Sequence, residues 1–223
     1  MKLALIMPAH NEALNLGRLL QKIRGIPLPG MEKEMVLVDD GSTDATAAIA
    51  RKEGAFVVSH PAKQGLGASL RSGIQTALAR GADLIVTFDS DGQHAPEDLP
   101  KMLEPLLQQK ADVVIGNRLT QKGSMPWRRR MANHLANFFT RRAGGISCGD
   151  SQSGFRAFTR EAAQKMELRA KHYEISSEIC VEIKTKNLKW TEVPIQNIYT
   201  PYSLSKGQGF FEGILTLFRL FKL

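Results

Sequence analysis

Apolar and polar positions alternate in blocks along the first half of the chain. Short runs rich in Val, Ile and Leu are typical of buried strands. Longer segments with apolar residues three and four positions apart, such as Leu16, Leu19, Leu20 and Ile23, are typical of amphipathic helices. The pattern predicts strands at 3–7, 35–39, 55–59, 84–88 and 112–116, and helices at 13–24, 44–53, 66–80 and 97–109.

The connections between these segments are short and carry glycine or proline, as at Gly54 and Gly81. Strands that alternate with helices in this way form a mostly parallel sheet with helices on both faces. A chain of 223 residues is long enough to form one domain with a sizeable core. We therefore expect an α/β fold built on a mixed, mostly parallel, Rossmann-like sheet flanked by helices.

Three of the predicted strands run directly into polar clusters. An α/β sheet binds its ligands beyond the carboxyl ends of its strands, so we expect these clusters to converge. Asp44 or Ser42 is expected to cap the helix at 44–53. The clusters are Pro8-Ala9-His10-Asn11-Glu12, Asp39-Asp40-Gly41-Ser42-Thr43-Asp44 and Asp89-Ser90-Asp91-Gly92-Gln93-His94.

Asp89 and Asp91 are the most informative pair in these clusters. Alternate residues of an extended segment point the same way, so both carboxylates can face one hard cation. An Asp-x-Asp sequence is also common in solvated turns. This pair, however, directly follows a buried strand and precedes Gly92, which suits a tight turn. A divalent ion held there would clamp a diphosphate, which predicts an enzyme acting on a nucleotide-activated substrate.

The charge of the chain points to an anionic partner. The formal net charge is +8, which favours nucleic acid, an acidic membrane surface or a phosphorylated ligand. No Asp or Glu occurs from Val113 to Gly149. Residues 131–139 of that stretch read as an amphipathic helix with basic residues on both sides, a pattern typical of a membrane interface and also of a solvated basic face over an ordinary buried stripe. The basic residues are Arg118, Lys122, Arg128, Arg129, Arg130, Arg141 and Arg142.

The end of the chain carries a second apolar segment, at 209–223. Its apolar arc is broad, so it can pack on the domain, on another subunit or on lipid. No apolar run reaches the roughly 18 residues needed to span a bilayer, and the first residues do not resemble a signal peptide. We expect a cytoplasmic protein, peripheral on the cytoplasmic face of a membrane. Cys148 and Cys180 suggest neither a disulfide framework nor a metal site, and are read as buried or incidental thiols.

The motifs together resemble the inverting family 2 glycosyltransferases of the GT-A fold. Within that family the chain is similar to the dolichol-phosphate mannose synthase and polyprenyl-phosphate glycosyltransferase branch, over essentially its whole length. The resemblance rests on the three polar clusters and on further motifs in the same order. These are Gly65-x-Gly67-x-x-x-x-Arg71-x-Gly73, Gly116-Asn117-Arg118, Asp150-Ser151-Gln152-Ser153-Gly154-Phe155-Arg156 and Ser205-Lys206.

The resemblance implies a donor site. Asp89, Asp91 and Gln93 would hold Mg²⁺ or Mn²⁺ against the diphosphate of a nucleotide sugar, GDP-mannose or a UDP-sugar. The metal would neutralise charge on the departing nucleoside diphosphate. The segment at Gly65 and Gly67 is read either as a phosphate loop or as a turn with close packing. The nucleotide-binding residues implied are Pro8, His10, Asn11, Glu12, Asp39, Asp40, Ser90 and Lys206.

The resemblance also implies an acceptor site, for a dolichyl or polyprenyl phosphate. Arg118 and Arg130 would hold its phosphate, because a guanidinium binds phosphate bidentately. Asp150 is the remaining candidate catalytic carboxylate. A lipid phosphate is already anionic at neutral pH, so Asp150 would orient the acceptor or the sugar, or cap its own loop through backbone N–H groups. Glu174 and Glu178, on an expected helix after Tyr173, would contact the sugar or be solvated.

The expected organisation is a catalytic domain at 1–208 followed by an amphipathic helix at 209–223. Within the domain, 1–117 is the nucleotide-binding half and 118–208 the acceptor-binding half. The membrane contact is expected through 124–142 and 209–223, and homo-oligomerisation is left open. Three alternatives remain: a family 2 enzyme with a sugar hydroxyl acceptor, a nucleic-acid-binding protein, and a non-catalytic relative. Nucleic acid is disfavoured because three acidic strand ends repel a polyanion, and the intact Asp pair disfavours the last.

Overall fold

The computed structural model describes residues 1–120, 125 and 127–198. Lys206 and the segment 209–223 lie outside the described residues. The strands are β1 (Lys2–Ala9), β2 (Glu32–Asp39), β3 (Phe56–Ser59), β4 (Leu84–Thr87), β5 (Val113–Asn117), β6 (Arg156–Thr159) and β7 (Trp190–Pro194). The helices are α1 (Ala13–Gly25), α2 (Thr46–Lys52), α3 (Leu66–Ala79), η1 (Pro96–Asp98), α4 (Leu99–Leu107), α5 (Trp127–Arg142), α6 (Arg160–Lys165) and α7 (Ile175–Thr185).

Every strand and helix predicted in the first half is present, with ends that shift by up to three residues. The helix predicted at 97–109 is divided into the 3-10 turn η1 and α4. The helix expected at 131–139 lies within α5, and the helix expected after Tyr173 is α7. The elements β6, α6 and β7 were not predicted. They lie in the second half, where the apolar runs are short.

The strands form one sheet in the order β3-β2-β1-β4-β6-β5-β7. Neighbouring pairs among β1, β2, β3 and β4 are parallel, and β5 pairs in parallel with β7. Only β6 runs against its two neighbours, β4 and β5. The prediction of a mixed, mostly parallel sheet is confirmed, and the sheet runs through both of the halves expected from the sequence.

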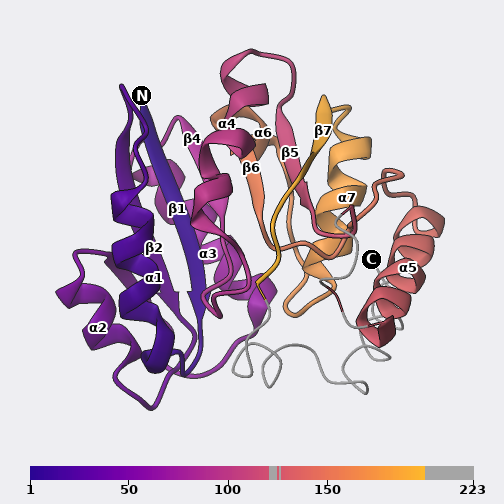
Figure 1. Cartoon of the computed structure of the whole chain (residues 1–223). Helices are drawn as coiled ribbons and strands as arrows, with labels where there is room; N and C mark the ends of the chain where they lie inside the picture. Colours follow the sequence, from indigo (N-terminus) through magenta and orange to yellow (C-terminus); the bar gives the residue numbers. More distant parts are fainter. Residues whose placement is uncertain (121–124, 126, 199–223) are drawn as a thin grey trace.

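Helices cover both faces of the sheet, as the period of two along β1 requires. Leu3, Leu5 and Met7 are buried in a core with residues of α1 and α4. Ala4 and Ile6 point to the opposite core, which contains residues of α3 and α7. In Figure 1, α1 and α4 lie in front of the sheet and α3 lies behind it. This three-layer arrangement brings the carboxyl ends of β1, β2 and β4 to one edge.

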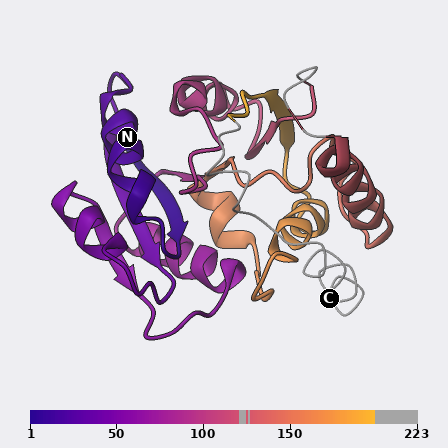
Figure 2. The same ribbon diagram turned by 60° about the horizontal axis from the view of Figure 1, so that its bottom comes forward.

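Helix α5 lies at the opposite end of the molecule from α1 and α2 (Figures 1 and 2). It packs mainly on α7, where Thr140 is buried and its hydroxyl lies 2.7 Å from that of Ser177. Three large apolar side chains of α5 stay exposed, namely Met131, Leu135 and Phe138. Within the described ranges, no helix combines the length and the apolar character needed to cross a bilayer.

Candidate active site

The three polar clusters meet at the carboxyl ends of β2, β1 and β4, as predicted. These strands are adjacent in the sheet, and hydrogen bonds join the segments that follow them. The Ser90 hydroxyl donates to the Pro8 carbonyl at 2.7 Å. A ring nitrogen of His10 lies 2.9 Å from the Asp40 carbonyl. All three clusters therefore contribute to one site, the position at which α/β sheets bind ligands.

Asn11 and Asp44 shape the segments around β1 and β2. Asn11 has a φ of 56°, a left-handed conformation that Asn tolerates well. Its side-chain oxygen accepts from the Thr43 N–H at 2.9 Å. The expected cap of α2 was wrong, since the cap position is Ala45. Asp44 instead accepts from the Thr46 N–H, two residues ahead, at 3.0 Å, which is an Asx turn rather than a helix cap.

Asp39 and Asp40 are both buried, and their bonding differs. Asp39 accepts one bond, from the Ser42 N–H at 3.1 Å. Asp40 accepts from the Gln64 and Gly65 N–H groups at 2.8 Å and bonds to His60 at 2.8 Å. Burial opposes ionisation, but these donors hold the pKa of Asp40 below its ordinary value. Asp40 therefore anchors the loop between β3 and α3.

The segment at Gly65 and Gly67 is a site of close packing. Gly65 has a φ of 101°, and a side chain there would overlap His172. A side chain at 67 would overlap the Ala170 carbonyl. Of the two interpretations of these glycines, the structure favours a turn that allows α3 to approach the segment before α7.

Asp89 is oriented by a histidine to which the sequence analysis assigned no role. His94 Nε2 lies 2.9 Å from Asp89 Oδ2. The imidazole is fully buried, and its ring centroid lies 5.5 Å from that of Phe88 and 5.4 Å from that of Phe155. The Asp89 side chain is 34% exposed. His94 thus fixes one carboxylate oxygen from the core side, and its place five residues after Asp89 was the available signal.

Asp91 lies close enough to Asp89 for the two charges to repel. Burial, with a further contribution from Asp89, raises the pKa of Asp91 to about 6. The Gln93 backbone N–H and side-chain amide donate to the two Asp91 oxygens at 2.9 and 2.7 Å. In the described part of the chain, no group of three or more His, Cys, Asp or Glu side chains is arranged to hold a metal ion. The candidate set is therefore two carboxylates with the amide of Gln93.

Gly154 supports Asp89 from the other side. A side chain at 154 would overlap the Asp89 carboxylate. The Gly154 carbonyl accepts from the Thr87 hydroxyl at 2.7 Å, which ties it to the end of β4. The motif from Asp150 to Arg156 therefore packs directly against the Asp89 side chain, and glycine is required for this close approach.

Asp150 and Arg118 form a buried ion pair. Arg118 Nε and Nη2 donate to the two Asp150 oxygens at 2.7 and 2.9 Å, and the Arg118 backbone N–H adds a bond at 3.1 Å. Asp150 is fully buried and the Arg118 side chain is 11% exposed. Burial opposes ionisation, but Arg118 holds the pKa of Asp150 below its ordinary value. The Asp150 carboxylate accepts from Arg118 rather than capping its own loop, and its low pKa disfavours uptake of a proton. Asp150 is therefore placed to orient Arg118.

The loop that carries Asp150 is held by side chains from two distant elements. Glu192, on β7, accepts from the Gly149 and Asp150 N–H groups at 2.6 and 3.3 Å. Asn137, on α5, accepts from the Ser151 N–H at 2.9 Å. Glu192 was missed by the sequence analysis, since nothing in its neighbourhood marks it.

Arg156 supports the same loop from the interior of the protein. It is the largest fully buried side chain in the described part of the chain, and its Nη2 donates to the Ser151 and Ser176 carbonyls at 2.7 and 2.9 Å. Burial opposes ionisation of Asp89, but His94 holds its pKa below the ordinary value, and Arg118 and Arg156 add to this effect. The Arg118–Asp150 pair therefore lies within electrostatic reach of the Asp89 site.

The remaining candidates lie apart from these contacts. Arg130 is exposed on α5. Glu174 and Glu178 are both buried, so of the two alternatives, contact with the sugar or solvation, the second was wrong. Glu178 accepts from the Arg169 and Ala170 N–H groups at 2.8 and 2.9 Å, which makes it a support for the turn before α7.

Comparison with known proteins places this geometry in a family. The sequence profile of Glycosyl transferase family 2 matches residues 4–167. The chain is 32% identical to the UDP-N-acetylglucosamine–dolichyl-phosphate N-acetylglucosaminyltransferase of Methanococcus voltae, over 98% of this chain and 94% of that protein. It is 31% identical to the polyprenol monophosphomannose synthase of Mycolicibacterium smegmatis, over 92% of this chain and 80% of that protein.

A solved structure confirms the fold. Glucosyl-3-phosphoglycerate synthase of Mycobacterium tuberculosis, crystallised with Mn²⁺, UDP and glucosyl-3-phosphoglycerate, superimposes with a TM-score of 0.72. The identity is 22%, and the alignment covers 98% of this chain and 79% of that one. The GT-A fold predicted from the sequence is therefore confirmed. The family profile matches most of the chain, so the chain belongs to glycosyl transferase family 2 and is a glycosyltransferase.

Proposed function

We propose that this chain transfers a hexose or N-acetylhexosamine from a nucleotide sugar to dolichyl or polyprenyl phosphate, with inversion at the anomeric carbon. Two relatives matched over at least 80% of their own length carry names of polyprenyl- or dolichyl-phosphate transferases. The observation that carries the proposal is the Arg118–Asp150 pair beside Asp89. It offers an oriented guanidinium and no free carboxylate base, which suits an acceptor that is already anionic.

In the proposed donor site, the clusters after β1 and β2 bind the nucleotide. Asp39 accepts from the base, and Pro8, His10 and Glu12 line the base and ribose. Asp89, Asp91 and Gln93 hold Mg²⁺ or Mn²⁺. The residues fit a divalent cation because two neighbouring carboxylates repel each other. Burial and the Asp89 charge raise the pKa of Asp91, and Asp89 is partly exposed. When bound, the cation neutralises charge on the leaving diphosphate.

In the proposed acceptor site, Arg118 binds the lipid phosphate and Asp150 sets the direction of its guanidinium. Pairing with Asp150 fixes the direction of the Arg118 guanidinium, a group that binds phosphate bidentately. The phosphate oxygen of a polyprenyl phosphate is ionised at neutral pH and attacks the anomeric carbon without a strong base. A low pKa at Asp150 is therefore compatible with the reaction.

The proposed membrane contact is the outer face of α5. Met131, Leu135 and Phe138 are exposed at positions four and three apart, so they form one apolar stripe. Arginines flank the stripe, and no acidic residue occurs between 113 and 149. This combination of apolar stripe and positive charge favours an anionic membrane surface. The expected contribution of 209–223 and of Lys206 lies outside the described residues.

The proposal is tested by transfer of label from a panel of GDP- and UDP-sugars to a short-chain polyprenyl phosphate in the presence of Mn²⁺ or Mg²⁺. We expect label from one donor to enter the organic phase. Asp91→Ala should reduce this transfer by at least a hundredfold while leaving the circular dichroism spectrum unchanged. Full activity of Asp91→Ala, or wild-type transfer that survives chelation of the metal, would contradict the donor site.

A further inference from the structure

The two cysteines of the chain lie in contact although they are 32 positions apart. Cys148 Sγ and Cys180 Sγ are 3.9 Å from each other. Cys180 is fully buried on α7, whereas Cys148 is half-buried on the loop that leads into Asp150. The proposed transfer reaction uses neither thiol. The two sulfurs are in contact, and a disulfide would require them to approach to roughly 2.05 Å.

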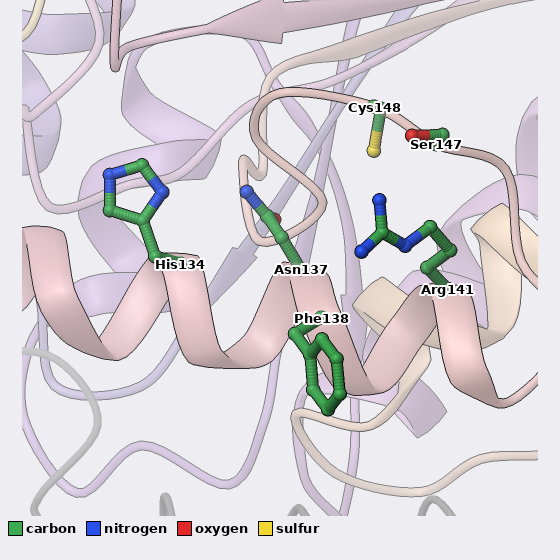
Figure 3. Close-up of a pocket in the computed structure, with 6 residues that line it drawn as sticks. All are labelled: His134, Asn137, Phe138, Arg141, Ser147 and Cys148. Carbon is green, nitrogen blue, oxygen red and sulfur yellow. The ribbon is translucent and has the colours of Figure 1, made fainter.

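Cys148 is reached through a cavity of about 200 Å³ between α5 and the loop. Figure 3 shows His134, Asn137 and Arg141 on one stretch of α5, with Ser147 and Cys148 on the loop opposite. A water molecule takes up roughly 30 Å³, so small polar reagents fit this space. Cys180, by contrast, is fully buried and does not line this cavity.

The contact also affects how the two thiols ionise. Hydrogen bonding from Cys148 lowers the pKa of the Cys180 thiol, while burial opposes this. The same bond raises the pKa of the Cys148 thiol. The two thiols therefore titrate as one coupled pair, and after the first proton is lost the two sulfurs share the proton that remains. A thiolate is the nucleophile in disulfide chemistry, and the pair supplies one in contact with a second sulfur.

We propose that Cys148 and Cys180 form a reversible disulfide, with a small hydroperoxide as the oxidant. When the proton shared by the pair lies on Cys180, the Cys148 thiolate attacks one peroxide oxygen and the O–O bond breaks. The leaving hydroxide takes the Cys180 proton and departs as water, so that Cys148 becomes a sulfenic acid and Cys180 a thiolate. The Cys180 thiolate then attacks the Cys148 sulfur, the S–O bond breaks, and the departing hydroxide takes up a proton. In sum, two thiols and one hydrogen peroxide give one disulfide and two waters. A small thiol reduces the bond by exchange.

The disulfide would bind the loop to α7 two residues before Asp150. That loop is already held by Glu192 and Asn137, so a new bond at Cys148 acts on a constrained segment and shifts the Arg118–Asp150 pair. Oxidation is therefore expected to raise the apparent KM for polyprenyl phosphate at least threefold and to leave the KM for the nucleotide sugar nearly unchanged. This consequence rests on the proposed function, whereas the disulfide itself does not.

The test is a thiol count on the purified full chain, using an alkylating reagent in denaturant followed by mass spectrometry. Reduced protein has two reactive thiols. After hydrogen peroxide treatment we expect none, a mass lower by two hydrogen atoms, and recovery of both thiols with dithiothreitol. Cys148→Ser and Cys180→Ala should each keep one thiol and form no internal bond. Two thiols left after treatment, a cross-linked dimer, or irreversible addition of oxygen would each overturn the proposal.

A second measurement separates a bond favoured by the fold from chance oxidation. In glutathione redox buffers, the ratio of disulfide to dithiol should be at least about tenfold higher for the folded chain than for the chain in urea, because folding holds the sulfurs together. An equal or lower ratio would overturn the proposal even if peroxide forces the bond. Kinetics of the oxidised protein then test the link to Asp150, and equal KM changes for both substrates would refute that link. The transferase activity itself is measured separately, on the reduced protein.

Discussion

Replacing Asp150 by Asn tests the buried ion pair. The change keeps the size of the side chain and one acceptor for the Arg118 backbone N–H, but it removes the charge that faces the guanidinium. Arg118 is then a cation with a side chain only 11% exposed. Removing one partner of a buried pair typically costs about 3–5 kcal/mol of unfolding free energy. Because Arg118 keeps some contact with solvent, we expect the lower end, about 3 kcal/mol.

The assay is urea denaturation at pH 7, with Glu167→Gln as the matched control. Glu167 pairs with Arg169 and Lys186 on the surface, where its side chain is 60% exposed, and loss of such pairs costs about 0–1 kcal/mol. Asp150→Asn should also raise the KM for polyprenyl phosphate more than the KM for the donor. A free energy of unfolding within about 0.5 kcal/mol of wild type would refute the reasoning, since that is the range of an ordinary surface change.

The pH dependence of unfolding of the same variant gives a second test of the ion pair. The pKa of Asp150 is lower in the folded state than its ordinary value, so the folded state binds fewer protons than the unfolded state. The stability that Asp150 contributes is therefore present above the unfolded pKa of roughly 4 and is lost as the pH falls through the folded pKa. The difference between wild type and Asp150→Asn should be largest near neutral pH and should shrink below about pH 4. A constant difference would contradict the ion pair.

Three further predictions concern the neighbouring features. His94→Gln should weaken Mn²⁺ binding about tenfold or more in calorimetry, because supports of ligating carboxylates typically contribute that much; unchanged affinity would remove His94 as a positioning residue. Gly154→Ala should reduce metal-dependent nucleotide binding by displacing Asp89. The control is Gly144→Ala, where the added methyl group meets open space but the φ of 92° favours glycine. It should affect folding stability alone. Charge reversal at Arg129 and Arg130 should weaken binding to anionic vesicles severalfold, and unchanged partitioning would contradict the membrane contact through α5.

The part of the fold that could be predicted is the part encoded locally. Strands β1, β2 and β4 have apolar runs bounded by polar clusters, and their shared direction follows from the helices between them. Strand β6 could not be predicted, because a four-residue strand lying antiparallel between β4 and β5 depends on pairing with residues far away in the chain. Its own sequence carries too short a pattern to indicate direction or position.

The candidate site divides in the same way. Asp89 and Asp91 were recognised because their place after a strand is visible in the sequence. The partners that orient the site residues were not, since each is chosen by tertiary contact: Asp150 pairs with Arg118 across 32 positions, and Glu192 reaches Gly149 across 43. Electrostatics between such partners decides whether a carboxylate is a base or an anchor, so the proposed role of Asp150 depends on a pairing that only the structure shows.

The measurement that tests the central claim most directly is a comparison of two acceptors with the same hydrocarbon tail, a polyprenyl phosphate and the corresponding polyprenol. A site that offers an oriented Arg118 should glycosylate the phosphate and leave the alcohol unmodified. The alcohol must lose a proton, and Arg118 holds the pKa of Asp150 below its ordinary value against the opposing effect of burial, which makes Asp150 a weak base. We therefore expect the rates to differ by at least a thousandfold under matched detergent conditions. Comparable transfer to the alcohol would contradict the account and would indicate a base that acts on a hydroxyl acceptor.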